Sequence, residues 1–471
     1  MIKETGMDTE KTICAIATSQ GGAIGIIRIS GKEAINIADE IFIPKDKTPL
    51  KERKPYTLAY GKICNNKEII DEVLISIFHA PHSYTGENCI EISFHNSQYI
   101  ADRILKLLIQ YGCRQASPGE YTQRAFINGK MDLSQAEAVA DLIASTNHAT
   151  HIMAMNQLRG KFSSELHSLR EQLLHMTSLI ELGLDFSDHE ELEFANNEDL
   201  LYLANKIESK ISSLLKSFKT GRAMKQGIPV AIIGKTNVGK STLLNQLLGD
   251  DKAIVSNIHG TTRDVIEDTI EINGVSFRFI DTAGIRKTTN TIENIGIERT
   301  FKKIDEASII IWVIDKIPTD NEIISIVPKL DGKKIIIAFN KSDCIDNIKT
   351  EIESLKQIIN KHSITDSSII ELSAKQGTNI SVLESIIYDV ANIPEIKEND
   401  IIITNIRHYE ALYSSHQNIK TLINGIKQNM GNELLSEELR QCIYNLGEII
   451  GGTIKTEDTL ESIFRNFCIG K

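Results

Sequence analysis

A phosphate-binding sequence stands near the middle of the chain. The segment GKTNVGKS at 234–241 follows the apolar run PVAII and precedes TLLNQLL. Glycines allow backbone N–H groups to curl around phosphate oxygens, Lys240 would neutralise their charge, and the hydroxyl of Ser241 suits Mg²⁺. Because the motif lies between a strand-like and a helix-like segment, it predicts a loop that binds the phosphates of a nucleotide.

Two later segments suit the sensing of a γ-phosphate. GTTRD at 260–264 provides Thr262 as a second ligand of Mg²⁺. DTAG at 281–284 follows TIEINGVSFRFI, in which Asn-Gly is typical of a β-hairpin. Asp281 can hold a metal-bound water, and the backbone of Gly284 can turn toward the γ-phosphate.

The base is predicted to be guanine. NKSD at 340–343 follows another β-branched run, and Asp343 can accept hydrogen bonds from the N1–H and 2-amino groups of guanine, which adenine does not offer. The backbone of Ser373-Ala374-Lys375 can donate to the guanine O6. These motifs, in this order at strand ends, predict a P-loop GTPase. Its predicted GTP-binding residues are Asn237, Val238, Gly239, Lys240, Ser241, Thr242, Ser256, Asn257, Ile258, His259, Gly260, Thr261, Thr262, Asp281, Thr282, Ala283, Gly284, Asn340, Lys341, Asp343, Ser373, Ala374 and Lys375.

The hydrolytic residue departs from the Ras-like pattern. After the DTAG glycine, Ras-like proteins place a glutamine that orients water, whereas this chain has Ile285, which has no polar side-chain atom. Another group must therefore position the water. Arg263 and Arg286 are candidates for stabilising the developing charge, although basic residues beside phosphates more often only position the ligand.

The composition describes an ordinary folded protein. The 471 residues suggest about three domains, and the net charge of −11 argues against a uniformly basic surface. Nucleic acid would therefore be held by a local Lys/Arg patch or by a partner protein. The seven cysteines form no CxxC pair, the N-terminus MIKETGMDTEKTI has no apolar core, and no apolar stretch is long enough to span a membrane. We expect reduced thiols and a cytoplasmic protein.

The pattern along the chain predicts a multidomain α+β and α/β protein. Apolar runs alternate with turns over 1–125, an α+β unit, and helical periodicity then covers 126–222. Runs such as ASIIIWVID alternate with helical segments over 223–394, which predicts a Ras-like domain with a mainly parallel sheet. The segment 395–471 is helical again. It is expected to join 126–222 in one helical domain, with the GTP-binding domain inserted between them.

The ends of the chain resemble the MnmE (TrmE) family of bacterial tRNA-modification GTPases. The C-terminus CIGK and the preceding SIFRNF match that family, and GGAIGIIRISG, SYTGENCIEISFHN and SPGEYTQRAFINGKMDLSQAEAVADLI resemble its N-terminal folate-binding region. The resemblance covers essentially the full length.

The family resemblance implies a mechanism of hydrolysis. TIENIGIER at 291–299 resembles the segment that carries the water-orienting glutamate, which falls on Glu293. A K⁺ ion at the interface of two facing G domains would replace an arginine finger. By position its ligands are Asn237, Ser256, Ile258 and Thr261.

The resemblance also implies a tRNA-modifying assembly. It indicates a homodimer formed through the N-terminal domains, a bound tetrahydrofolate derivative in its 5-formyl or 5,10-methylene form, and a flavin-dependent partner protein in a heterotetramer or larger complex. The product is an aminomethyl-type or carboxymethylaminomethyl-type group on the wobble uridine of certain tRNAs. The folate residues by position are Arg28, Glu91, Lys130 and Lys471, and Cys468 is a candidate for catalysis. A carboxylate such as Glu91 can pair with the aminopyrimidinone edge of a pterin.

Two other functions remain open from the sequence. A ribosome-assembly GTPase of the related K⁺-dependent group would carry a basic RNA-binding domain such as a KH fold, and the tail shows no obvious basic stripe. A GTP-regulated scaffold without hydrolysis would be favoured if Glu293→Ala had no effect.

Overall fold

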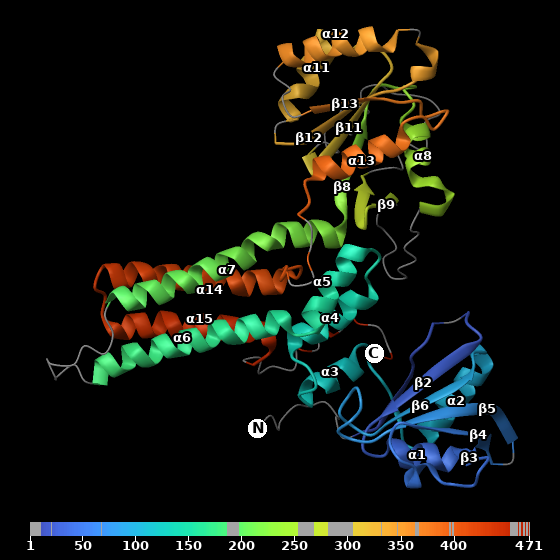
Figure 1. The fold of residues 1–471 in the computed structure, drawn as a ribbon. Coiled ribbons are helices and arrows are strands. Elements are labelled where there is room, and N and C mark those ends of the chain that lie inside the picture. The colour runs from blue at the N-terminus through green and yellow to red at the C-terminus, as the bar shows by residue number, and fades with distance from the viewer. Residues whose placement is uncertain are drawn as a thin grey trace. The chain divides into compact units, whose positions relative to one another are not determined.

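Figure 1 shows the computed structural model of the chain, which describes residues 11–471 apart from 20, 67, 186–196, 253–267, 281–304, 331, 346, 363–366, 395–396, 398–399, 453–459, 461–462, 465–466, 468–469 and 471. The chain forms two compact units. One contains the N-terminal residues up to 143, residues 157–208 and the residues from 414 on, and the other contains 144–156 and 209–413.

The first unit begins with a mixed sheet of seven strands in the order β3-β4-β5-β6-β2-β1-β7. Only the pair of β1 with β7 is parallel among these strands. The strands are β1 (Ile13–Ile16), β2 (Ile24–Ser30), β3 (Phe42–Pro44), β4 (Thr57–Asn65), β5 (Glu68–Phe78), β6 (Cys89–His95) and β7 (Arg114–Gln115).

Alternation along the strands separates the two faces of this sheet. Ile27 and Ile29 of β2 are buried in one core with α1 (Ala34–Ile41) and α2 (Gln98–Gln110). Arg28 lies between them in the sequence, and side chains alternate along a strand, so it points to the opposite face. The register pairs Arg28 with Glu91 of β6, so both charged side chains share that face.

Helices complete the first unit. They comprise α3 (Glu120–Ile127), α4 (Leu133–Ile143), α6 (Lys161–Asp185) and α15 (Asn432–Ile450), together with parts of α7 (Asn197–Gln226) and α14 (Ile406–Lys427). A capping box starts α4, because the Asp132 carboxylate accepts from the Gln135 amide and the Gln135 side chain accepts from the Asp132 amide. Segments from both sides of the inserted domain meet here: α6 runs along α15, and His416 of α14 lies 2.7 Å from Glu208 of α7.

The second unit contains a six-stranded sheet in the order β13-β12-β11-β8-β10-β9, parallel except for the β9–β10 hairpin. Its strands are β8 (Ile228–Ile233), β9 (Asp268–Ile272), β10 (Val275–Phe279), β11 (Ile309–Ile314), β12 (Lys334–Phe339) and β13 (Ser367–Glu371). Its helices are α5 (His148–Leu158), α8 (Lys240–Lys252), α11 (Asp320–Ile326), α12 (Ile348–Lys361) and α13 (Ile380–Ala391).

Both faces of this sheet are covered, which explains the continuous β-branched runs. Ile309, Ile311 and Val313 of β11 share a core with α8 and α13. Ile310 and Trp312 alternate with them and share the other core with α11 and α12. Helices thus lie on both sides of the sheet (Figure 1).

The predicted fold class is confirmed: an α+β N-terminal domain, a helical domain and an α/β domain with a mainly parallel sheet are all present. The exact domain boundaries at 125, 222 and 394 remain predictions. Within the described residues, no helix has the length and hydropathy needed to cross a membrane.

Candidate functional site

The phosphate-binding loop has the geometry that its sequence predicts. It follows β8 and ends where α8 begins at Lys240. Gly234, Asn237 and Gly239 all have positive φ, at 143°, 63° and 98°. A Cβ at Gly234 would lie 2.2 Å from the Val313 carbonyl oxygen, so the backbone passes too close to β11 for any side chain. This path leaves the loop's amide groups and the N-terminus of α8 to surround an anion.

The loop lysine is held by the loop itself. Lys240 Nζ donates to the carbonyl oxygen of Gly234 at 2.7 Å and also to that of Lys235. Ser241 and Thr242 follow in the first turn of α8. The ammonium group is therefore already placed over the loop, where it can exchange carbonyl oxygens for phosphate oxygens.

Asn340 joins the three loops that would surround the nucleotide. Asn340 is 3% exposed, and its Nδ2 donates to the Val238 carbonyl oxygen at 2.7 Å. Its Oδ1 accepts from the Ala374 amide at 2.9 Å. A Cβ at Gly239 would stand 2.2 Å from this Nδ2, so only glycine fits there. One side chain thus holds the phosphate loop and both guanine loops in register.

The predicted guanine-binding carboxylate is oriented by a neighbour. Ser373 Oγ donates to Asp343 Oδ1 at 2.6 Å, and this hydrogen bond lowers the pKa of Asp343, so the side chain is an ionised acceptor. Lys341 Nζ forms an ion pair with Asp315 at 2.7 Å. Asp315 was not predicted as a site residue, although its place directly after β11, at the same sheet edge, would have indicated it.

Several predicted site residues lie outside the described residues. They are Glu293 and Cys468, the loop residues Ser256, Asn257, Ile258, His259, Gly260, Thr261 and Thr262, the segment Asp281, Thr282, Ala283 and Gly284, the arginines Arg263 and Arg286, and Lys471. Of the predicted K⁺ ligands, Asn237 is described, and its side chain is exposed. Of the predicted Mg²⁺ ligands, Ser241 is described.

A second candidate site lies in the N-terminal sheet. Arg28 Nε and Nη2 donate to Glu91 Oε1 at 2.9 and 2.7 Å. The guanidinium carbon lies 5.5 Å from the centre of the Tyr84 ring and 5.7 Å from that of Tyr121. Burial lowers the pKa of Arg28, but the charge and hydrogen bond of Glu91 outweigh it, and the net pKa is raised. Two predicted folate residues are thus brought together, and Arg28 also contacts two aromatic rings.

The other predicted folate residues are less directly placed. Lys130 Nζ donates to the Pro81 carbonyl oxygen at 3.0 Å. Gly470, the residue before Lys471, accepts a hydrogen bond from Arg28 Nη1 at 3.3 Å, so the end of the chain reaches the Arg28–Glu91 pair. Tyr84 and Tyr121 were not predicted as site residues. Their signal was present, since each lies in a segment that carries the family resemblance.

A network of buried, paired charges connects helix α3 to this second site. Glu120 is 2% exposed and accepts from Arg124 Nη2 at 2.9 Å and Arg114 Nη2 at 2.5 Å. Arg124 Nη1 also donates to Glu87, which accepts from the Ser30 hydroxyl. Because the buried charges are paired and hydrogen-bonded, the network holds α3 against the strands that carry Arg28 and Glu91.

Comparison with known proteins finds relatives along the whole chain. The family model described as the MnmE helical domain matches residues 133–468, and that of the GTP-binding protein TrmE N-terminus matches residues 12–130. The tRNA modification GTPase MnmE of Phocaeicola vulgatus is 54% identical over 99% of this chain and 100% of its own length. The protein of that name from Bacteroides thetaiotaomicron is 53% identical over 98% of this chain and 100% of its own length.

Among solved structures, a variant of Aquifex aeolicus Era bound to GDP and aluminium fluoride is 31% identical, covering 41% of this chain and 67% of that chain, with a TM-score of 0.27. The family assignment does not depend on this partial likeness. Relatives more than half identical along their whole length, and two family models that together run from the first strand to the C-terminal segment, establish that this chain belongs to the MnmE (TrmE) family.

Proposed function

We propose that this chain is a GTPase that uses GTP hydrolysis to drive modification of the wobble uridine of tRNA. The observation that carries the GTPase assignment is the buried Asn340 side chain, which joins the phosphate loop to the loop of Ala374. The role in tRNA modification follows from relatives of the MnmE family that match the chain end to end.

Guanine selection rests on Asp343. Its ionised carboxylate is an acceptor only, and Ser373 Oγ holds one of its oxygens at 2.6 Å. The two donors on the guanine edge match this acceptor, whereas adenine presents a ring nitrogen acceptor in place of N1–H. Lys341, which is paired with Asp315, precedes Asp343 by two residues and would flank the base.

Hydrolysis requires an in-line water and stabilisation of charge on the phosphates. We assign orientation of the water to Glu293, because Ile285 cannot perform it, and coordination of Mg²⁺ to Ser241 and Thr262. A K⁺ ion held by Asn237 and by Ser256, Ile258 and Thr261 would stabilise the negative charge between the β- and γ-phosphates when two G domains face each other. Asn237 is exposed in the phosphate loop, which supports this assignment because its side chain is accessible to a cation.

The N-terminal site fits a one-carbon tetrahydrofolate in its 5-formyl or 5,10-methylene form, which supplies the carbon of the modification. Tyr84 is partly exposed and offers an aromatic surface, and Glu91 offers a carboxylate for the donors of the pterin edge, whereas Tyr121 is buried and supports Arg28 from within the core. Arg28 orients Glu91, while Lys130 and Lys471 suit the anionic parts. We also assign a catalytic role to Cys468, which precedes Gly470 by two residues in the sequence; the Gly470 carbonyl oxygen accepts a hydrogen bond from Arg28.

The same proposal includes the assembly. The chain would act in the cytoplasm as a homodimer joined through its N-terminal domains, with a flavin-dependent partner protein in a heterotetramer or larger complex. The net charge of −11 supports recruitment of tRNA through a local basic patch or through that partner.

Mass spectrometry of tRNA tests this function. Nucleosides at the wobble position would be compared in cells that lack this protein, in the same cells supplied with the wild-type chain, and in cells supplied with Asp343→Asn. Loss of the modified uridine in the first and third strains, with recovery in the second, is expected. An unchanged profile in cells lacking the protein would contradict the role in tRNA modification and leave only the GTPase.

A further inference from the structure

Helix α5 is attached to the nucleotide-binding sheet although it lies in the sequence between helices of the first unit. Residues 144–156 group with 209–413 in one compact unit. Ala149 and Met153 of α5 belong to the same buried cluster as Ile272 and Val275 of the β9–β10 hairpin. The helix therefore packs on this hairpin.

The tip of the hairpin is bonded to the N-terminal end of α5. Asn273 and Gly274 form the turn with φ of 50° and 80°. The Gly274 carbonyl oxygen accepts from the Ala149 amide at 3.2 Å. An amide in the first turn of a helix has no partner within the helix, so the hairpin satisfies a donor that α5 cannot satisfy itself.

One side chain joins the helix and the hairpin. Asn147 Oδ1 accepts from the Thr150 amide at 2.9 Å, as a residue that caps a helix N-terminus does. Its Nδ2 donates to Ser276 Oγ of β10 at 2.7 Å. Asn147 is 7% exposed and Ser276 is 5% exposed, so water could not easily replace the hydrogen-bond partner of either side chain if this bond were lost.

The hairpin is connected directly to both predicted nucleotide-sensing segments. β9 begins at Asp268, soon after the predicted Mg²⁺ ligand Thr262, and β10 ends at Phe279, two residues before Asp281. β10 pairs with β8 along Phe277–Phe279, and the hairpin tip extends beyond Ile228, the first residue of β8. The tip is bonded to α5, while strand β9 also packs against α8 and α13.

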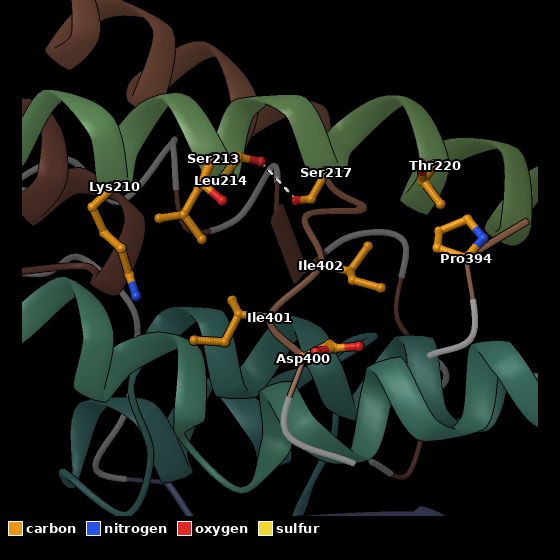
Figure 2. A pocket seen from close by; sticks show the side chains of 9 residues that line it. All are labelled: Lys210, Ser213, Leu214, Ser217, Thr220, Pro394, Asp400, Ile401 and Ile402. Carbon is orange, nitrogen blue, oxygen red and sulfur yellow. Dashed lines mark hydrogen bonds between the residues drawn. The ribbon is translucent and has the colours of Figure 1, made fainter. Parts of the chain in front are cut away.

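The other end of α5 holds the chain that returns from the G domain. Asn156 Nδ2 donates to the Asp400 carbonyl oxygen at 3.3 Å. Three residues later the Ile403 amide donates to Ser217 Oγ of α7 at 3.1 Å. Ile401, Ile402 and part of α7 line a cavity of about 360 Å³ (Figure 2), and Ile402 and Ile403 also approach Gly221 of α7 closely.

We propose that α5 transmits the nucleotide state of the G domain to the helical segments and that Asn147 is the positioning residue that couples them. This inference rests on the proposed function, because it names the connection between GTP hydrolysis and tRNA modification. Asn147 touches neither nucleotide nor tRNA in this assignment. It acts through strand β10.

Two substitutions remove the same hydrogen bond from opposite sides. Asn147→Ser keeps a side chain that caps α5 well but is too short to reach Ser276. Ser276→Ala removes the acceptor and leaves the cap of α5 intact. Glu271→Gln is the matched control, because Glu271 pairs with Ser276 across the hairpin yet is exposed.

The full-length variants would be tested for GTP turnover, for wobble-uridine modification in cells that lack the wild-type chain, and for hydrogen exchange of α5. We expect turnover within about twofold of wild type and modification per GTP hydrolysed at least about tenfold lower in both variants. Modification per GTP hydrolysed by the double variant should be no lower than in either single variant, because all three variants lose the same hydrogen bond. Exchange in residues 148–158 should differ between GDP and GDP with aluminium fluoride in the wild type and in Glu271→Gln, and this difference should vanish in the two variants.

Three outcomes would overturn the coupling role. Normal modification by both variants is one, and an unchanged nucleotide dependence of α5 exchange is another. An equal loss of GTP turnover and modification is the third, because it would make the bond a support of the G domain itself. Failure of the wild-type chain to restore modification would instead contradict the proposed function.

Discussion

Removing the Asn340 side chain should loosen the nucleotide-binding loops by an amount that the structure bounds. Asn340→Ala leaves the Val238 carbonyl oxygen and the Ala374 amide without their partner in a site where Asn340 is 3% exposed. A buried polar group left without a hydrogen bond costs about 1–3 kcal/mol, so the two together cost about 2–6 kcal/mol.

This free-energy cost can appear as a lower free energy of unfolding, as a weaker affinity for GTP, or as both. If the loops stay ordered in the variant, the nucleotide-free and nucleotide-bound forms are destabilised equally, and the free energy of unfolding falls while GTP affinity is unchanged. If the loops loosen without nucleotide, binding must order them, and GTP affinity falls about tenfold for every 1.4 kcal/mol. The sum of the two losses should therefore fall within about 2–6 kcal/mol.

The single tryptophan of the sequence makes this sum measurable. Trp312 is buried in β11 of the same sheet, so its fluorescence during urea unfolding reports on the G domain within the full chain. Calorimetry would give the GTP affinity. Ser354→Ala is the control, because its exposed hydroxyl bonds only to a carbonyl within α12, and it should change stability by less than about 0.5 kcal/mol. A summed loss below about 1 kcal/mol in Asn340→Ala would refute the bridging role.

Four further predictions concern the other side chains. Asp343→Asn should weaken GTP binding by several kcal/mol, because one acceptor becomes a misplaced donor. Wild-type affinity of this variant in calorimetry would contradict the guanine assignment. Glu293→Ala should keep GTP affinity and lower turnover by about 10² or more, whereas an equal loss in both would make Glu293 structural. Turnover should rise in K⁺ relative to Na⁺ at equal ionic strength, and Asn237→Ala should lose this stimulation; identical rates of the wild type in both salts would exclude the cation mechanism. Glu91→Gln should sharply weaken formyl-tetrahydrofolate binding without changing GTP turnover, and unaltered affinity would place the pterin elsewhere.

Local sequence patterns predicted the nucleotide site and the elements that carry it. The phosphate loop needs glycine at positions of close approach such as 234 and 239, and the Asn-Gly turn needs two residues of positive φ, so these signals are contained in a few neighbouring residues. The continuous β-branched runs likewise predicted strands buried on both faces, because only such strands tolerate apolar side chains at every position.

Patterns of helical spacing predicted helices but not their buried sides. Ile143 is 43% exposed although it shares a periodic series with Ala136, and Leu434 is 60% exposed while Leu435 is buried. The reason is that spacing defines a stripe, whereas its direction depends on the neighbouring elements. In α4 the neighbours include Phe464, near the other end of the chain.

Contacts between distant segments lay beyond local patterns altogether. The register that pairs Arg28 with Glu91 depends on the position of β6 beside β2, and no local signal sets that order. Asn147 and Ser276 are 129 residues apart in the chain, so no local sequence pattern could predict their hydrogen bond. The family resemblance implied Arg28 and Glu91, and the fold added the two aromatic rings that Arg28 contacts.

The close approach of Gly221 to Ile403 shows how the GTPase domain is inserted into the chain. A Cβ on Gly221 would stand 2.3 Å from the Ile403 carbonyl oxygen, so the polypeptide leaves α7 and returns toward α14 at nearly one point. A turn of a few residues could close that gap, with little difference in loop-closure entropy from other short connections. The GTPase module is thus inserted between two points of the chain that lie close together, but replacing it would also require a new partner for α5, whose Ala149 and Met153 are buried in the core of that module.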